Sequence, residues 1–373
     1  MESLEHRDET ALLERRISRG GFVKATGAVA LAGALGTAPA AFGRSGAPIR
    51  GKRVGELIIV EAPFFNEFNS WMKKEFTPSG VRLTISSAEG SAQKGQNIVE
   101  TFIAQDFDGI IIITAPVTGF DSLVRRAKAE GKCVINHSAG AIGGVDQNVQ
   151  VDHEGAGRGI GKVAAGWANT KAGGKVRVGI LTNLEDPDQK RRTDGAIAEL
   201  KKRVRDFEVV QTAQGQSAEQ GAASSANMLQ ANPDINMIIT HNTVGGAGAF
   251  TAAVEAGKTN RNEFFLGSVD LEDAVLERIQ RGSIYQVGWS FFFSYSSTLM
   301  ARDMERCLSG ARINPTRVLI GRPVTRAGAA AYRKIISQPR SPANRKLYSN
   351  PNVMRYSKVR LRTGQNAASA IKS

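Results

Sequence analysis

The 373-residue chain contains only two cysteines, Cys133 and Cys307. Their spacing matches no metal-binding motif, and two thiols are too few for the disulfide framework of a small secreted domain. A single disulfide in an oxidising compartment and two separate buried thiols both fit this count. The sequence alone leaves that choice open.

Acidic residues are missing from the last part of the chain. The last one is Glu305, and residues 306–373 carry 15 Lys and Arg, so a total of +14 leaves a net of −1 (14 − 15) for the first 305 residues. Because the body is near neutral, the positive total does not indicate nucleic-acid binding. We expect either a solvated basic tail or a tail that contacts anionic membrane lipid or an acidic partner.

The motifs of several enzyme classes are also missing. The chain has no G-x-S-x-G elbow, no P-loop and no H-E-x-x-H helix. The glycines of Gly155–Gly161 do not follow a long buried strand, so we interpret them as packing residues of a helix. His137, His153 and His241 have no metal-ligand spacing. We therefore expect no catalytic residue, no metal and no cofactor.

The apolar stretch near the N-terminus, Ala25–Ala38, is too short and too weakly hydrophobic for a membrane span. It follows an arginine-rich region and precedes the small residues Ala38 and Ala40, which suit a signal peptidase. We predict a cleaved signal peptide over residues 1–40 and export to the periplasm. Ser18–Lys24 resembles the twin-arginine motif, but Gly20 replaces its second arginine, so the export route stays open between the twin-arginine and general pathways.

From Lys52 onward, apolar strands alternate with amphipathic helices. The run Gly109–Thr114 is typical of a strand buried on both faces of a parallel sheet. The alternation continues to about residue 136 and restarts with a helix at Ala156–Thr170. Two such α/β units in tandem predict two doubly wound, Rossmann-like lobes with a cleft between them.

These patterns also suggest domain boundaries. We predict an N-terminal lobe of residues 52–151 plus 290–318 and a C-terminal lobe of residues 152–289 plus 319–335. Residues 337–373 are rich in Pro, Asn and Arg and have little periodicity. We expect them to form an extended or partly disordered basic tail.

Aromatic and polar side chains follow the predicted strands, where ligands of open parallel sheets lie. Aromatic faces cover the C–H face of a sugar ring, and Arg, Asn and Asp satisfy its hydroxyls. Taken singly, Phe64 and Phe65 could be a packing feature, and Asp270 could be a helix N-cap. The candidate binding residues are Phe64, Phe65, Asn136, His137, Arg192, Asn242, Asp270 and Trp289.

Four segments, in this order, resemble the ribose-type family of periplasmic sugar-binding proteins that serve ABC transporters. They are Ala62-Pro63-Phe64-Phe65, Arg192-Thr193-Asp194-Gly195, Thr240-His241-Asn242 and Gly267-Ser268-Val269-Asp270. The resemblance covers about residues 52–335 and implies the type I periplasmic binding protein fold, with a three-segment hinge near 150–154, 288–291 and 316–320. It also implies that the two phenylalanines stack on the ligand and that Arg192, Asn242 and Asp270 bond its hydroxyls.

The sequence departs from the family's pattern at the first-lobe side of the site. The family usually has Asn at Ala62, Asp-Arg at Asn136-His137 and Gln near Trp289. Because changed polar partners alter specificity strongly, we expect a sugar or polyol other than ribose, with Trp289 as an apolar wall.

The resemblance also implies a partner, an inner-membrane ABC permease. An alternative is a sensing protein that presents its ligand to a membrane receptor or sensor kinase. Sugar-responsive repressors share the fold but carry an N-terminal helix-turn-helix. Here an export signal occupies that place, so we expect no nucleic-acid partner.

Overall fold

The computed structural model describes residues 48–371 except 62, 115–116, 139 and 340, and the side chains of 63–64 and 342–343 are also outside the description. The predicted signal peptide and Ala62 therefore lie outside the described residues. Among the described helices, none is both long and apolar enough to cross a bilayer.

The first sheet, with its helices, forms the N-terminal lobe. Its strands are parallel except β13, which runs antiparallel to β11 at the sheet edge. Within the described residues its spatial order is β13 (Met354–Ser357), β11 (Thr316–Leu319), β5 (Gln147–Val151), β4 (Cys133–His137), β3 (Gly109–Ile112), β1 (Arg53–Ile58) and β2 (Arg82–Ser87).

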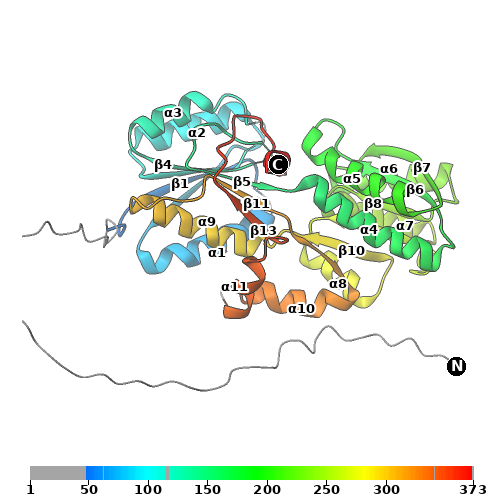
Figure 1. Cartoon of the computed structure of the whole chain (residues 1–373). Coiled ribbons are helices and arrows are strands. Elements are labelled where there is room, and N and C mark those ends of the chain that lie inside the picture. Colours follow the sequence, from blue (N-terminus) through cyan, green and yellow to red (C-terminus); the bar gives the residue numbers. More distant parts are fainter. Residues whose placement is uncertain (1–47, 62, 115–116, 139, 340, 372–373) are drawn as a thin grey trace, which may run out of the picture. The chain divides into compact units, whose positions relative to one another are not determined.

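Two pairs of helices cover the faces of this sheet. Figure 1 shows α2 (Ala92–Ala104) and α3 (Asp121–Ala129) on one face, and α1 (Pro63–Ser79) and α9 (Phe293–Leu308) on the other. The strands supply both faces with buried aliphatic side chains, because alternate residues of a strand point to opposite sides. Leu57 packs in the cluster of α2 and α3, whereas Val54 and Ile58 pack in the cluster that includes α1 and α9.

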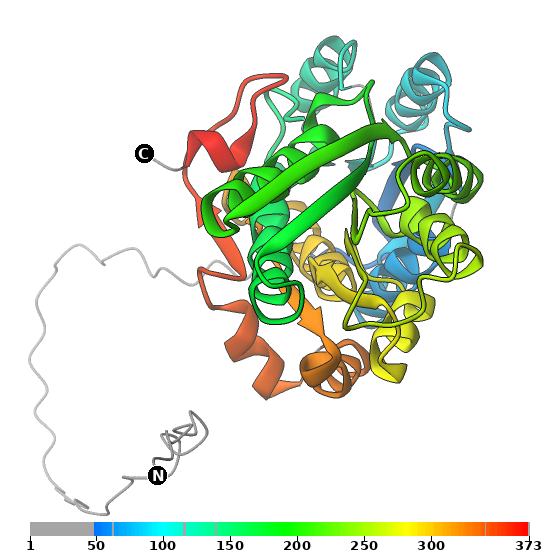
Figure 2. The same ribbon diagram turned by 90° about the vertical axis from the view of Figure 1, so that its right-hand side faces the viewer.

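The second sheet, with its helices, forms the C-terminal lobe (Figure 2). In spatial order the described strands are β12 (Arg322–Thr325), β10 (Tyr285–Ser290), β9 (Phe265–Val269), β8 (Met237–Thr240), β6 (Lys175–Thr182) and β7 (Asp206–Gln214). The described helices of this lobe are α4 (His153–Lys171), α5 (Pro187–Arg203), α6 (Ala218–Ala231), α7 (Thr243–Glu255), α8 (Asp273–Arg281) and α10 (Arg326–Ser337). Helix α4 packs against α5, α6 against α7, and α8 against α10.

The two-sheet α/β architecture predicted from the sequence is confirmed. Within the described residues the chain crosses between the sheets between β5 and α4, between β10 and α9, and between β11 and β12. It then crosses once more, because β13 follows α10 in the chain and lies in the first sheet. This additional return after α10 was not predicted.

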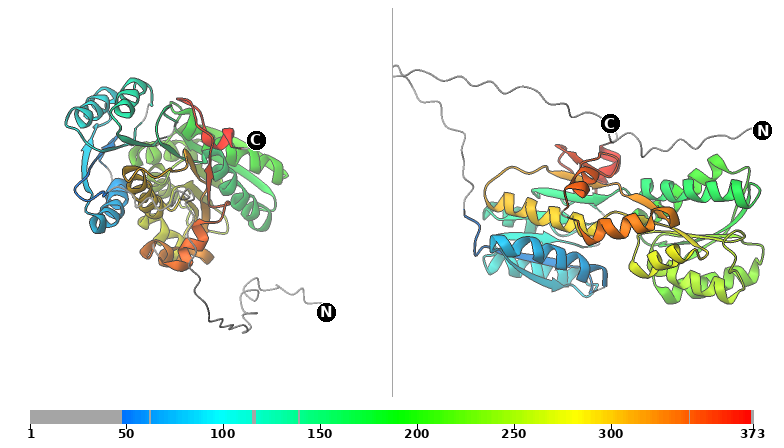
Figure 3. Two further views of the ribbon diagram at one scale, coloured as in Figure 1. Left: turned by 60° about the vertical axis from the view of Figure 1, so that its left-hand side comes forward. Right: turned by 90° about the horizontal axis from the view of Figure 1, so that it is seen from below.

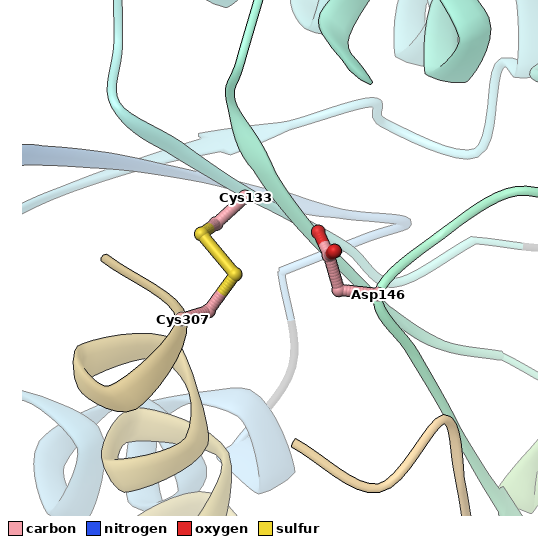
Figure 4. Close-up of side chains that lie close together, drawn as sticks. All are labelled: Cys133, Asp146 and Cys307. Atoms are coloured by element: carbon pink, nitrogen blue, oxygen red, sulfur yellow. A yellow bond between two sulfur atoms is a disulfide. The ribbon is translucent and has the colours of Figure 1, made fainter. Parts of the chain in front are cut away.

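The two cysteines form a disulfide, which settles the choice that the sequence left open. Cys133 begins β4 and Cys307 lies in the last turn of α9, with their Cα atoms 6.0 Å apart. Figure 4 shows Asp146 beside them. The sulfurs are bonded to each other and Asp146 accepts from Lys128 Nζ at 2.6 Å, so these side chains already have partners. The bond ties α9 covalently to the sheet that it covers.

The prediction of an extended C-terminal tail was wrong. Residues 342–348 form α11 (Pro342–Tyr348), β13 pairs with β11, and residues 367–370 form α12 (Ala367–Ala370), beside the first sheet (Figure 3). The segment folds because it brings its own apolar anchors, Tyr348 and Leu361, which are buried. Its Arg and Lys side chains stay mostly exposed, and contact with anionic lipid remains a prediction.

Glu56 is a carboxyl group in the core of the first sheet. It lies in β1, is 0% exposed, and neither carboxyl oxygen has a hydrogen-bond partner among the described residues. Desolvation raises its pKa from 4.5 to about 8, although Lys73 opposes the shift. Burial disfavours the charged form, so the side chain is neutral at pH 7.

We expect Glu56→Gln to remove a pH-dependent loss of stability. In the unfolded chain the carboxyl ionises near its ordinary pKa, while in the folded chain it stays protonated until about pH 8. Wild-type stability should therefore fall as pH rises through that interval, with a difference from the variant that grows to roughly 4 kcal/mol by pH 8. Urea unfolding at pH 5, 6.5 and 8 measures this. Glu255→Gln, at an exposed site, is the control, and parallel curves for wild type and Glu56→Gln would contradict the assignment.

Candidate functional site

A cavity of about 410 Å³ lies between residues of the two lobes, at the carboxyl ends of their strands. Its volume is within the range of roughly 300–1,000 Å³ that is common for small-molecule sites. Ile59, Phe65, Ile113, Thr114, His137, Ser138 and Phe293 line it from the first lobe. Val151 and, from the second lobe, His153, Asp186, Gln189, Arg192, Gln216, Asn242, Thr243, Val244, Asp270, Leu271 and Glu272 complete it.

Arg192 is the centre of the polar network in this cavity. Its Nη1 donates to Asp270 Oδ2 at 2.7 Å and to the carbonyl of His241 at 2.9 Å, and its Nε donates to His153 Nδ1 at 3.0 Å. The residue is only 8% exposed. Because Arg192 and Asp270 neutralise each other, the pair offers hydrogen-bonding groups without a net charge.

Close packing of α4 on α5 fixes the place of Arg192. A Cβ on Gly157 would lie 1.8 Å from the Arg192 carbonyl oxygen, and one on Gly195 would lie 2.5 Å from the Glu154 carbonyl oxygen. Only glycine allows the two helix backbones to approach this closely. The glycine-rich segment 155–161 is thus a packing surface, as expected, and here it positions a binding-site candidate.

Asp270 follows β9 and has a left-handed backbone, with φ of +69°. A hydrogen bond helps to hold this conformation, because the Asp270 carbonyl accepts from the Trp289 N–H at 3.2 Å. Helix α8 begins only at Asp273, so the alternative role of Asp270 as its N-cap does not apply. Its Oδ1 has no hydrogen-bond partner among the described residues. Strained polar residues at strand ends often mark ligand sites.

Two neutral imidazoles lie on opposite sides of the cavity. Burial lowers the pKa of His137 to about 4 and that of His153 well below its ordinary value, the latter helped by Arg192. His137 Nδ1 is 3.0 Å from the Val149 carbonyl and must donate to it, which leaves a lone pair on Nε2. His153 Nδ1 accepts from Arg192, so its Nε2 carries the hydrogen. One ring thus offers an acceptor and the other a donor.

Asn242 lines the cavity, but its amide also has a structural task. Its Oδ1 caps α7 by accepting from Gly245 N at 2.8 Å, and its Nδ2 donates to the Gln216 carbonyl at 3.2 Å. Each atom retains one further hydrogen-bonding position. Asn242 is therefore placed where the sequence predicted, with less of its amide free for a ligand.

Of the two phenylalanines predicted to contact the ligand, the structure describes the side chain of one. Phe65 lines the cavity, while the side chain of Phe64 lies outside the described part of the structure. Phe293, the first residue of α9, also lines the cavity and was not among the predicted residues. Its ring centre is 6.2 Å from that of His137.

The structure places two predicted site residues away from the cavity wall. Asn136 is fully buried and donates to Asn148 Oδ1 at 2.8 Å and to the Gly140 carbonyl at 3.0 Å, so its Nδ2 holds the loop after β4. Trp289 lies inside β10, donates to the Ile320 carbonyl at 2.9 Å and packs where Gly159 lacks a side chain. The expected apolar wall at Trp289 is instead part of the packing between β10 and α4.

The candidate set lacked several polar residues of the cavity, among them His153 and Gln189. His153 is the second residue after β5, a strand that the sequence pattern did not reveal. Had that strand been recognised, the rule that ligands lie beyond strand ends would have selected His153. Gln189 lies in the first turn of α5, one turn before Arg192, and helix periodicity places both on one face.

Comparison with known proteins agrees with this architecture. The family model described as the periplasmic binding protein domain matches residues 59–303. The ribose import binding protein of Bacillus subtilis is 24% identical over 227 residues, which are 60% of this chain and 72% of that protein.

Two solved structures are similar in fold. An ABC transporter periplasmic solute-binding protein from Actinobacillus succinogenes with bound D-allose has a TM-score of 0.68 and 19% identity, over 75% of this chain and 100% of its own. A solute-binding protein from Bacillus halodurans with bound myo-inositol has a TM-score of 0.67 and 19% identity, over 77% of this chain and 98% of its own.

Proposed function

The chain belongs to the periplasmic binding protein family, and from that premise we propose that it captures a neutral sugar or polyol other than ribose between its lobes. It then delivers the ligand to an inner-membrane ABC permease. The family is extracytoplasmic, in keeping with the export signal predicted over residues 1–40. The proposal draws support from the relatives, whose names include ribose import and bound D-allose and myo-inositol.

The observation that carries the proposal is the charge balance of the cavity. Arg192 is paired with Asp270, and the imidazoles of His137 and His153 are neutral. Asp186 and Glu272 also line the cavity and add negative charge. A phosphorylated or carboxylated sugar would meet these carboxylates without an unpaired cation, whereas hydroxyl groups can both donate and accept.

The first-lobe wall argues for a ligand with one less polar side. Ile59, Phe65 and Ile113 contribute apolar surface there, and Thr114, His137 and Ser138 are the polar residues beside them. The Asn136 amide is used within the lobe. A ring that presents C–H groups to this wall and hydroxyls to Arg192 and Asp270 fits the two sides best.

A thermal-shift panel tests this function. Purified protein lacking residues 1–40 would be heated with D-allose, myo-inositol, L-arabinose and D-ribose, and with glucuronate and ribose 5-phosphate as charged counterparts. A ligand present at 100 times its dissociation constant should stabilise the folded state by about 2.7 kcal/mol. We expect at least one neutral member to do so and both charged members to fail. A shift confined to the charged compounds, or none at all, would refute the proposed ligand class.

A further inference from the structure

The C-terminal segment, defined here as residues 341–371, presents a run of positive charge on a folded support. Residues 355–362 have the sequence Arg-Tyr-Ser-Lys-Val-Arg-Leu-Arg. We call residues 355–362 the basic edge, because they begin in β13, the edge strand of the first sheet. The segment is outside the range 59–303 that the family model matches, so its charge is a feature of this chain. The four cationic side chains of the basic edge are all exposed: Arg355, Lys358, Arg360 and Arg362.

The backbone of the basic edge is held in place by the first lobe. Strand β13 pairs with β11, and Thr316 Oγ1 donates to the Val359 carbonyl at 2.6 Å. Leu361 is only 5% exposed and anchors the end of the run. Just beyond it, Thr363 Oγ1 accepts from Gly143 N at 2.9 Å. The cations therefore project from fixed positions on the lobe, which a solvated tail would not provide.

The charges of the basic edge are not neutralised by ion pairs. None of its four cations makes an ion pair within the described residues, and the only side-chain hydrogen bond that they make there runs from Arg355 Nε to the Pro351 carbonyl, at 3.2 Å. Because no acidic residue follows Glu305, neighbours in the sequence offer no carboxylate. By contrast, exposed Arg126 pairs with Glu130 one helical turn away. The positive charge of the basic edge is thus available to a partner.

Protection of a sheet edge explains only part of this charge. Charged side chains on an edge strand discourage pairing with the strand of another chain, and Arg355 in β13 suits that task. Strand β13 ends at Ser357, however, and the other three cations, Lys358, Arg360 and Arg362, lie beyond it. These three need another explanation.

Two large apolar side chains are exposed among these cations. Tyr356 is 44% exposed and Val359 is 41% exposed, and they are two of the six large hydrophobic side chains that are exposed in the described part of the chain. An acidic protein surface would satisfy the cations but would need a matching pocket for the apolar groups. The interfacial layer of a bilayer accepts Tyr and aliphatic side chains while its headgroups bind Lys and Arg. The mixture of side chains therefore favours a lipid surface.

We propose that the basic edge is a docking surface for a membrane that contains anionic lipid. Its cations lie beside the lipid phosphates, and Tyr356 and Val359 enter the interfacial layer. None of these residues lines the cavity between the lobes, so the surface is separate from the candidate ligand site. Each Lys or Arg close to an anionic membrane contributes about fivefold in affinity, and the attraction falls off within a Debye length.

Flotation with lipid vesicles tests this surface. Protein lacking residues 1–40 would be mixed with vesicles of pure phosphatidylcholine, or of equal parts of phosphatidylcholine and phosphatidylglycerol, at about 0.15 M salt. We expect binding to the mixed vesicles to be at least about 100-fold stronger than binding to the neutral ones. At about 1 M salt the Debye length falls from about 8 Å to about 3 Å, so most of this difference should disappear.

Substitutions separate the basic edge from the net charge of the protein. Lys358→Gln with Arg360→Gln removes two positive charges and should weaken binding to the mixed vesicles about 25-fold. The matched control, Lys201→Gln with Lys202→Gln, removes two charges from exposed positions of α5 and should weaken it less than about threefold. Lys358→Arg with Arg360→Lys exchanges the two cations and should bind as the wild type does.

Each result bears on the docking surface. Binding that the two glutamines weaken, and that the control and the exchanged cations keep, supports it. Absence of binding to the mixed vesicles would overturn it, as would equal losses in the glutamine variant and its control. A soluble polyglutamate peptide that binds as tightly as the mixed vesicles would assign the surface to an acidic protein and overturn it too. None of these measurements requires a bound sugar, so failure of the docking surface and failure of the proposed function are distinguishable.

Discussion

Replacing Gly157 with alanine is expected to lower the free energy of unfolding by about 2–3 kcal/mol and to weaken ligand binding at least tenfold. The new Cβ would lie 1.8 Å from the carbonyl oxygen of Arg192, which is backbone and cannot rotate away. Overpacking of this kind costs roughly 1–3 kcal/mol because the helices must separate. Binding suffers as well, since the displaced backbone is that of the residue that organises the cavity.

Gly166→Ala is the matched control for this prediction. Gly166 lies in the same helix, and a Cβ there would have no atom within 4 Å. Alanine is favoured over glycine in a helix by about 1 kcal/mol, so this variant should be slightly more stable than wild type. Urea unfolding and calorimetric titration of the screen's best ligand measure both effects. Equal behaviour of the two variants would contradict the role given to the α4–α5 contact.

Arg192→Met is expected to weaken binding by roughly 2–3 kcal/mol, about 30- to 150-fold. Methionine keeps much of the apolar length of the side chain but removes all three hydrogen bonds, to Asp270, His153 and the His241 carbonyl. The Asp270 carboxylate is then left without its cation in a partly buried site. The loss therefore includes the cost of that unpaired charge.

A second substitution separates these contributions. Asp270→Asn should recover part of the affinity in the Arg192→Met background, because it removes the unpaired charge, and asparagine tolerates the left-handed backbone of position 270. Lys202→Met, at an exposed position of the same helix, is the control. If the double variant loses as much binding free energy as the Arg192→Met and Asp270→Asn variants lose together, the two residues do not act as a pair.

Most of the fold could be predicted because its strands are apolar and its helices amphipathic. The run that became β3 is buried at all four positions, which is the environment that its isoleucines indicate. Strand β5 escaped prediction because its sequence, Gln-Asn-Val-Gln-Val, is polar in three of five positions. Those polar side chains are buried with partners such as Asp303 and Ala367, which come from distant parts of the chain.

The C-terminal segment was misjudged for a related reason. Its Pro, Asn and Arg residues give no helical or strand period, and β13 forms only because β11 offers it an edge. Tyr348 is similarly uninformative until Tyr295 and Phe292 are seen beside it. Such contacts join residues about 50 positions apart, so local pattern cannot reveal them.

The candidate site was predicted best where the residues follow recognised strands. Phe65, His137, Arg192, Asn242 and Asp270 all line the cavity. Asn136 also lies near the end of a recognised strand, β4, but its side chain is buried in the interior of the lobe. The strand-end rule gives the edge of the sheet at which a residue lies, whereas the direction of its side chain depends on strand register.

The most direct test of the whole account is a crystal structure of the protein with the strongest neutral ligand from the panel. The account predicts one ligand in the cavity between the lobes, with a hydroxyl within hydrogen-bond distance of Asp270 or Arg192 and a C–H face against Phe65. A ligand bound elsewhere on the surface, or in the cavity without contact to Arg192 or Asp270, would contradict the central claim.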